Sequence, residues 1–433
     1  MITPFLDLPD SDTYILRDAR VPACLVQARG TEDLVRVDLL VQGGRLAALG
    51  AGLERPGVPA VELDGALVWP TFQDIHTHLD KGQIWQRAPN PDGTFAQALT
   101  ATATDREAHW TRDDIAVRME FALRSAYAHG TSAIRTHLDS FAPHLDIVWA
   151  LFRELQARWR GRIDLQAASL CLLGQLAGDV GRAIARQVAA TEGGMLGGLV
   201  VHEPGLADAL DRLFGLASEH GLDLDLHVDE NGVETGTGLE QVARAALRHR
   251  YRGRVLCGHC CSLAVQPEPR RRETIALVAE AGLGIVSLPL CNLYLQDRQP
   301  GATPRWRGIT LLHELAAAGV PVMLASDNTR DPFFAYGDLD MLEVFSQSVR
   351  IGHLDHPFLD WPRAITTRPA EWMGRPAPLA IGGPADLVVF DARSLNELLS
   401  RPQADRLVIR SGRPTATTPP RYRELDGLFH SGC

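Results

Sequence analysis

The chain has 433 residues, of which 45% are hydrophobic and 22% charged, as in an ordinary globular protein with one large domain or two. Its formal net charge of −10 argues against a basic surface for nucleic acid. No apolar run of about 18 residues and no secretion signal are seen, so we expect no membrane span. The seven cysteines, an odd number, fit a reducing cytoplasm rather than a disulfide framework, and we expect a cytoplasmic protein.

Both ends of the chain have the pattern of β-structure. Two strand-like stretches flank Gln42-Gly43-Gly44, which is a hairpin signal. The strand-like stretches are residues 35–41 and 45–49 near the start and residues 385–390 and 406–410 near the end. We therefore expect residues 1–67 and 375–433 to pair into one small β domain beside the middle of the chain.

The middle of the chain, residues 68–374, alternates between short β-rich runs and longer helix-like stretches such as residues 242–247 and 311–315. The eight runs are residues 66–70, 132–137, 162–167, 198–202, 222–227, 254–259, 284–288 and 320–327. Eight β-then-α units are typical of an α/β fold of the (β/α)8, or TIM barrel, type. The alternative is an open doubly wound sheet, but the Gly-x-Gly-x-x-Gly turn expected after its first strand is absent.

Histidine and acidic residues recur where these runs end. Residues i and i+2 of a strand point to the same face, so His76 and His78 can aim both imidazoles at one point. The other polar residues at run ends are His137, Asp139, His202, His227, Glu230, His259 and Asp327. Because barrel enzymes form their sites at the C-terminal ends of the strands, these side chains are expected to converge there.

This set of residues predicts a catalytic metal centre. His76, His78, His227 and Asp327 supply the three or four ligands that a divalent metal needs, and Asp327 can also accept a proton from metal-bound water. A metal lowers the pKa of bound water from about 15.7 to about 7. Glu230 is placed to act as a general acid/base, and His259 to polarise the bound hydroxide.

Over nearly its whole length, the sequence resembles the amidohydrolase superfamily, in particular its cytosine deaminase-like branch. The stretches that carry this resemblance are residues 292–298, 307–310 and 326–333, followed by Gly337 and Met341. The resemblance implies a composite β-sandwich built from both chain ends. It places the metal ligands, the proton-shuttling glutamate and the hydroxide-activating histidine on the residues named above.

The resemblance also bears on the number of metal ions. Binuclear relatives bridge their metals with a carboxylated lysine near the end of the fourth strand, where this chain has Val200-Val201-His202-Glu203. Its single lysine, Lys81, follows the first strand instead. We therefore expect one divalent ion per chain, zinc or iron, with manganese as a further candidate.

The substrate is the least defined feature. Where cytosine deaminases place a glutamine this chain has Leu172, and Asn328 and Phe333 also depart from that pattern, while Gln175 is a candidate to replace the missing amide. Leu79-Asp80-Lys81 and Ser326-Asp327-Asn328 instead resemble triazine amidohydrolases of the N-isopropylammelide type.

We predict a hydrolytic deaminase of a small N-heterocycle, cytosine or a related pyrimidine- or purine-like base, that releases ammonia. The alternatives are an enzyme that removes an alkylamine from a triazine-type ring and another cyclic amidine or amide hydrolase. The expected partner is the small heterocyclic substrate, and we expect neither nucleic acid nor a membrane as a partner. We also expect a homo-oligomer, whose number of subunits the sequence does not define.

Three rival readings are weaker. Cys257-Gly258-His259-Cys260 matches the Cys-x-x-Cys pattern of dithiol redox proteins. However, it ends a predicted barrel strand and lacks the preceding tryptophan of a thioredoxin-like unit. A structural barrel without activity would not need the full set of ligands together with Glu230. The small zinc deaminases are excluded because no Pro-Cys-x-x-Cys occurs.

Overall fold

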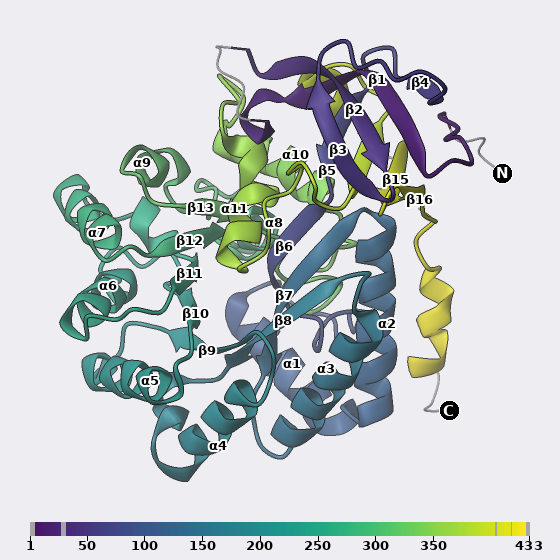
Figure 1. Ribbon diagram of the computed structural model, residues 1–433. Coiled ribbons are helices and arrows are strands. Elements are labelled where there is room, and N and C mark those ends of the chain that lie inside the picture. The colour runs from purple at the N-terminus through teal and green to yellow at the C-terminus, as the bar shows by residue number, and fades with distance from the viewer. Residues whose placement is uncertain (1–4, 27–31, 403–404, 417, 430–433) are drawn as a thin grey trace. The chain divides into compact units, whose positions relative to one another are not determined.

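The computed structural model describes residues 5–26, 32–402, 405–416 and 418–429 (Figure 1). The chain divides into two compact units. One lies within Met1–Gln73, Arg124–Ser132 and Asp340–Pro419, and the other within Asp74–Leu123, Ala133–Leu339 and Pro420–Cys433. Within the described ranges, no helix is both long enough and apolar enough to cross a membrane.

The larger unit is built around a parallel sheet of eight strands in the spatial order β13-β12-β11-β10-β9-β8-β7-β6. The strands are β6 Phe72–Thr77, β7 Thr131–Asp139, β8 Asp164–Leu170, β9 Gly194–Val200, β10 Leu224–Val228, β11 Val255–His259, β12 Gly284–Ser287 and β13 Val322–Leu324. A parallel bridge between Thr77 and Asp327 joins the two ends of this sheet and closes it into a barrel. Seven of these strands overlap a predicted β-rich run, and the predicted barrel is confirmed. The prediction for the first strand was wrong: residues 66–70 form β5, Leu67–Pro70, which pairs in the other sheet, and the barrel begins with β6 instead.

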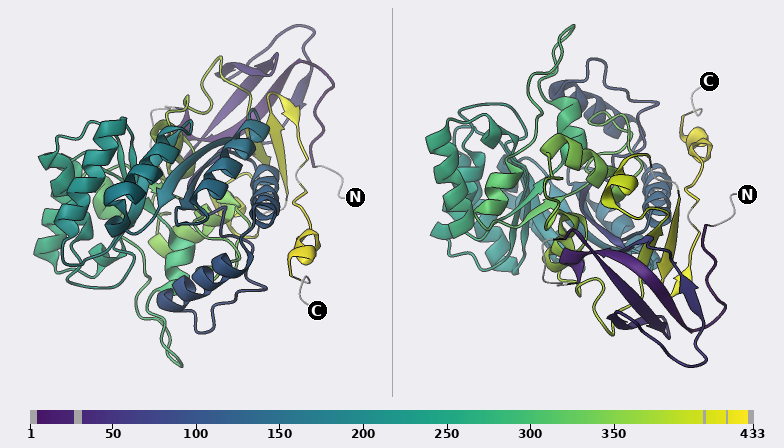
Figure 2. Two further views of the ribbon diagram at one scale, coloured as in Figure 1. Left: turned by 90° about the horizontal axis from the view of Figure 1, so that it is seen from below. Right: turned by 90° about the horizontal axis from the view of Figure 1, so that it is seen from above.

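Helices cover the outside of the barrel strands; α4 to α7 are the clearest in Figures 1 and 2. The helices of this unit are α1 Phe95–His109, α3 Leu145–Trp159, α4 Gly178–Ala189, α5 Leu206–His220, α6 Gly238–Arg248, α7 Glu268–Glu280, α8 Pro289–Leu295 and α9 Leu312–Ala317, with α2 Arg112–Ala128 extending beyond it. In α3, Val148, Phe152, Leu155 and Trp159 are buried. Their three- and four-residue spacing makes one apolar stripe, which explains why the segment is helical and which face it buries.

The smaller unit contains the sheet β16-β15-β14-β5-β1-β2-β3, with β4 paired to β1. Its strands are β1 Thr13–Pro22, β2 Leu34–Gln42, β3 Arg45–Gly50, β4 Ala60–Glu62, β5 Leu67–Pro70, β14 Leu387–Phe390, β15 Arg406–Arg410 and β16 Arg413–Pro414, and its helices are α10 Met341–Gly352, α11 Thr367–Trp372 and α12 Leu395–Leu399. Antiparallel pairing of β5 with β14 joins the two ends of the sequence. The prediction of a β domain made from both chain ends is confirmed, while its boundaries at residues 67 and 375 stay predictions.

The predicted hairpin joins β2 to β3, with Gln42 opposite Arg45. Gly43 and Gly44 form its two-residue turn with φ of +56° and +75°. Two consecutive positive φ angles match the twist of a hairpin and favour glycine. At Gly44 a Cβ atom would also lie 2.8 Å from the carbonyl oxygen of Ser411, so a larger residue would need the backbone to move.

The junction between the first and last barrel strands is held by a small set of hydrogen bonds. The Asp74 carboxylate accepts from the Ser326 backbone N–H at 3.1 Å and from the Ser326 hydroxyl at 2.5 Å. The next backbone N–H, that of Asp327, donates to the carbonyl of His76 at 2.9 Å. These bonds fix the sequence register between β6 and the segment after β13, which carries Asp327.

Removing the Ser326 hydroxyl should destabilise the protein. Ser326→Ala leaves one oxygen of the buried Asp74 carboxylate without its donor. A buried acceptor left without a hydrogen bond lowers the free energy of unfolding by about 2 kcal/mol. We expect the melting temperature to fall by about 4 °C. Thr100→Ala is the control, because the exposed Thr100 hydroxyl bonds only to a carbonyl of its own helix. Equal melting temperatures for both variants in a thermal scan would contradict a role for this junction.

Candidate functional site

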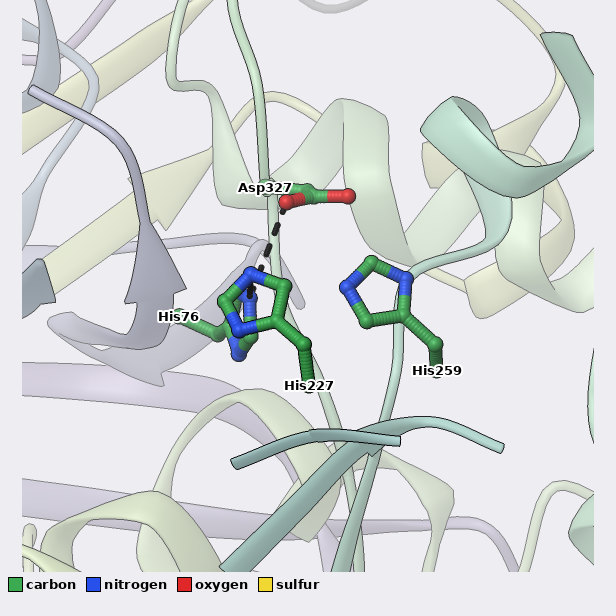
Figure 3. Close-up of side chains that lie close together, drawn as sticks. All are labelled: His76, His227, His259 and Asp327. Atoms are coloured by element: carbon green, nitrogen blue, oxygen red, sulfur yellow. Dashed lines mark hydrogen bonds and ion pairs between the residues drawn. The ribbon is translucent and has the colours of Figure 1, made fainter. Parts of the chain in front are cut away.

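Four side chains from the ends of three barrel strands meet at one point. His76 lies in β6, His78 just after it, His227 in β10 and Asp327 after β13. The Nε2 atom of His227 is 3.2 Å from that of His76 and 3.1 Å from that of His78. Asp327 Oδ1 is 3.1 Å from His78 Nε2 and 3.7 Å from His76 Nε2. Figure 3 shows His76, His227 and Asp327 turned toward one another, with His259 beside them.

The chemistry of these donors fits a divalent cation. All four side chains are buried, and both carboxylate oxygens of Asp327 accept no hydrogen bond within the described chain. Burial lowers the pKa of His76, His78 and His227 well below the usual value, so the imidazoles are neutral and can act as ligands. Ligands about 2.1 Å from a tetrahedral metal are separated by about 3.4 Å, which is the spacing seen here. Imidazole with carboxylate suits zinc and iron.

The backbone at the strand ends is in an unusual conformation. Asp229, His259 and Asp327 have φ of +47°, +67° and +65°, in the left-handed region that residues other than glycine rarely adopt. Asp229 directly follows β10, His259 ends β11, and Asp327 lies three residues after β13. Such strain persists where the surrounding structure enforces it, and it is common at functional sites. Here it occurs where the strands end and the side chains converge.

Glu230 and His259 form a second group beside the first. Glu230 Oε1 lies 3.3 Å from His259 Nδ1, and the Asn292 amide nitrogen lies 3.4 Å from Glu230 Oε1 and 3.0 Å from His259 Nδ1. Burial, followed by the negative charge of Asp327, raises the pKa of Glu230 well above its usual value. Burial lowers the pKa of His259 to about 3, so its ring is neutral.

Asn292 selects the tautomer of His259. An amide NH2 group can only donate, so His259 Nδ1 accepts and the single ring proton sits on Nε2. Nε2 has no hydrogen-bond partner among the described residues. The Nε2–H group of His259 is therefore free to donate a hydrogen bond to a molecule that binds in the site. Asn292 was not given a role from the sequence, although it opens residues 292–298, the stretch most specific to the family resemblance.

A pocket leads to this cluster and encloses about 630 Å³, including the part open to solvent. That volume lies in the range of small-molecule sites. The apolar side chains that line it are Phe95, Leu99, Phe141, Leu170, Leu172, Leu199 and Phe333, and the polar ones are His78, Lys81, Thr102, Arg106, Asp139, His227, Glu230 and Asn328, with Cys171 between them. Although eight of the lining side chains are polar, most of the surface that the pocket exposes is apolar.

One part of the pocket wall carries two cations on one carboxylate. Lys81 Nζ lies 2.7 Å from Asp139 Oδ1, and Arg106 Nη1 lies 2.6 Å from Asp139 Oδ2. The Lys81 ammonium also lies 5.4 Å from the centre of the Phe333 ring. Because each of these charged groups is largely buried and paired, this part of the wall is held in place.

The predicted substrate residues are not all in the pocket. Leu172, Asn328 and Phe333 line it, and the Asn328 amide also donates to Asp331 at 2.7 Å. Gln175 is not among the lining residues, because its side-chain carbonyl accepts from the backbone N–H of Leu172 at 3.1 Å.

Besides His259, two strand-end histidines lie outside the ligand group. His202 is exposed, and its Nδ1 pairs with the Thr237 hydroxyl at 2.6 Å. His137 is buried with its ring 4.0 Å from that of His76, and its Nε2 lies 3.5 Å from Asp225 Oδ1. It therefore packs against the ligand histidines.

Comparison with known proteins gives the family. A model of the amidohydrolase family matches residues 149–416. The chain is 50% identical over 431 residues to a pterin deaminase of Rhizobium rhizogenes, covering 98% of this chain and 99% of that relative. The chain belongs to the amidohydrolase family.

More distant amidohydrolases share most of the chain's length. N-isopropylammelide isopropyl amidohydrolase of Pseudomonas sp. strain ADP is 25% identical, covering 87% of this chain and 92% of the relative. The crystal structure of 5-methylcytosine deaminase from Klebsiella pneumoniae, liganded with 5-fluorocytosine, superimposes with a TM-score of 0.80 at 24% identity, covering 92% of this chain and 96% of that one. The predicted resemblance and the predicted hydrolase acting on non-peptide carbon–nitrogen bonds are both confirmed.

The dithiol hypothesis finds no support in the geometry. Cys257 and Cys260 are buried free thiols, and burial raises the pKa of both, so neither forms the reactive thiolate readily.

The buried thiols should be inert in the native amidohydrolase. Cys171, Cys257, Cys260, Cys261 and Cys291 are all buried, so a thiol reagent should modify them only after unfolding. All seven cysteines should react in denaturant. Titration with a chromogenic disulfide, with and without prior treatment by a dithiol reductant, measures this. Rapid native reaction of two thiols only after reduction would revive the redox hypothesis.

Proposed function

We propose that this amidohydrolase is a hydrolytic deaminase of a pterin-type ring, a fused bicycle whose reacting ring is a 2-amino-4-oxopyrimidine. The observation that carries this proposal is the 50% identity to a pterin deaminase over almost the full length of both chains. The pocket agrees with it, because its mainly apolar wall suits a flat aromatic bicycle. Leu172 in place of an amide also weakens the earlier expectation of cytosine itself.

The metal ligands in this proposal are His76, His78, His227 and Asp327, which hold one divalent cation, zinc, iron or manganese. When bound, such a cation supplies Lewis acidity that lowers the pKa of a water molecule from about 15.7 to about 7.

Glu230 moves the protons of the reaction. Water oxygen adds to the ring carbon that bears the exocyclic amine, and Glu230 transfers a proton from that water to the adjacent doubly bonded ring nitrogen. The second water proton passes through the same carboxyl group to the amine, the carbon–nitrogen bond breaks, and ammonia leaves behind a carbonyl. The buried position and raised pKa of Glu230 suit a group that must hold a proton near neutral pH.

His259 and Asn292 assist without gaining or losing a proton. The Nε2 proton of His259 is available to the oxygen that attacks the ring carbon, and it stabilises the negative charge that develops there. Asn292 keeps the His259 ring in this tautomer and contacts Glu230 with the same amide. The expected homo-oligomeric state and cytoplasmic location stay predictions.

A substrate screen tests the proposed activity. Ammonia release should be fastest with pterin, slower or absent with cytosine, and no amine should be released from N-isopropylammelide. The last compound tests the alternative that follows from the 25% identity to N-isopropylammelide isopropyl amidohydrolase. Turnover of that compound in preference to pterin would overturn the proposal.

Metal content is expected to approach one ion per chain and to depend on His227. His227→Ala removes a ligand from the centre of the group, since its Nε2 contacts both other imidazoles. This variant should retain less than about a tenth of the metal and lose activity. His109→Ala, at an exposed histidine of α1, is the control. Elemental analysis that finds the His227 variant fully loaded would remove His227 from the ligand set.

Glu230→Gln should keep the metal and lose turnover. The amide preserves the shape of the side chain but cannot exchange a proton, so kcat should fall by about 10²- to 10⁴-fold. Glu234→Gln, at an exposed carboxylate of the same loop, should leave kcat unchanged. Steady-state kinetics with matched metal content distinguish the two, and a fully active Glu230 variant would rule out the shuttle.

A further inference from the structure

The mouth of the pocket has two leucines that are unusually exposed for residues lining a binding site. Leu99 is 45% exposed and Leu172 is 53% exposed, yet both line the pocket. Deeper lining residues such as Thr102 and Phe333 are only 3% and 7% exposed. Large apolar side chains left facing solvent at the edge of a pocket gain free energy when a ligand covers them.

Leu99 is held in place by the helix that carries it. Phe95, Leu99, Thr102 and Arg106 of α1 all line the pocket, and their spacing of four, three and four residues puts them on one helical face. Near one end of this stripe the Phe95 ring meets the Phe333 ring edge-on at 5.7 Å. At the other end Arg106 pairs with Asp139. The exposure of Leu99 therefore belongs to an anchored helix.

Leu172 is also fixed through its backbone. Its N–H donates to the side chain of Gln175, and Leu172 forms a parallel bridge with Leu199. The neighbouring carbonyl, that of Cys171, accepts from the Leu199 N–H at 2.9 Å. Since the backbone is tied to the end of β9, the exposed side chain is a constant part of the pocket edge.

The position of the reacting group determines what reaches these leucines. The carbon that is attacked must lie beside His78, His227 and Glu230, which form the inner end of the pocket. A single six-membered ring placed there is surrounded by buried groups. A ring fused to its far side extends toward the mouth, where Leu99 and Leu172 can cover it.

We propose that Leu99 and Leu172 bind the outer ring of a fused bicyclic substrate and thereby set a preference for bicyclic over monocyclic 2-amino-4-oxopyrimidines. This inference rests on the proposed deaminase function and concerns the same site. It gives Leu172 a positive role, because an apolar side chain at this position covers a second ring, which an amide would cover less well.

The test uses two compounds with the same reacting ring, pterin and isocytosine, which lacks the outer ring. For the metal-loaded wild type we expect kcat/KM to be at least about 100-fold higher for pterin. Leu99→Ala and Leu172→Ala should each lower kcat/KM for pterin by about tenfold, mainly through KM, because they remove binding that is equal in ground and transition states. Values for isocytosine should stay within about twofold.

Three controls accompany these variants. Val117→Ala, at another exposed apolar residue that does not line the pocket, should change neither substrate. Leu99→Met and Leu172→Met keep apolar bulk and should restore most of the pterin value. Where isocytosine turns over too slowly, its inhibition constant against pterin replaces its kcat/KM.

The outcomes separate the two proposals. Equal losses for pterin and isocytosine, or no loss for either, overturn the role of the leucines while the deaminase function stands. Pterin binding without ammonia release, seen by quenching of pterin fluorescence in fully metal-loaded protein, overturns the deaminase function. In that case tighter pterin binding by wild type than by the alanine variants still supports the role of the leucines, and equal binding overturns it.

Discussion

The closure of the barrel is the constraint on which the site depends. His76 and Asp327 are 251 positions apart, yet the Asp327 N–H donates directly to the His76 carbonyl, and Asp74 holds Ser326 by two further bonds. Main-chain hydrogen bonds thus set the distance between carboxylate and imidazole before any ion binds. A shift in register at this one seam would separate the ligands even if every other strand stayed in place.

The site is preorganised because its residues are carried by the strands of the closed barrel. The metal ligands lie in or just after β6, β10 and β13, which belong to one continuous sheet. Glu230 lies in the loop after β10, and His259 is the last residue of β11. His259 and Asp327, whose side chains meet in the site (Figure 3), both have left-handed backbone. The rigid strands hold the functional side chains in fixed positions, and strained backbone occurs where these side chains converge.

Much of this arrangement could be predicted from the sequence. The strand period placed His76 and His78 on one face, and the run of eight β-then-α units brought His227 and Asp327 to the same end. His202 shows the limit of that reasoning: it ends a predicted β-rich run, but β9 stops two residues earlier, at Val200, and the exposed His202 ring pairs with Thr237 instead. The α1 face that lines the pocket was not predicted, because the sequence of this helix does not show which barrel strands it packs beside.

Lys81 has a practical consequence for work on this enzyme. It is the chain's single lysine, and it is 4% exposed, between Asp139 and the Phe333 ring. Amine-directed labels, cross-linkers and acylating reagents therefore find almost no accessible side-chain amine on this molecule. Any lysine adduct that does form reports that the pocket wall has opened.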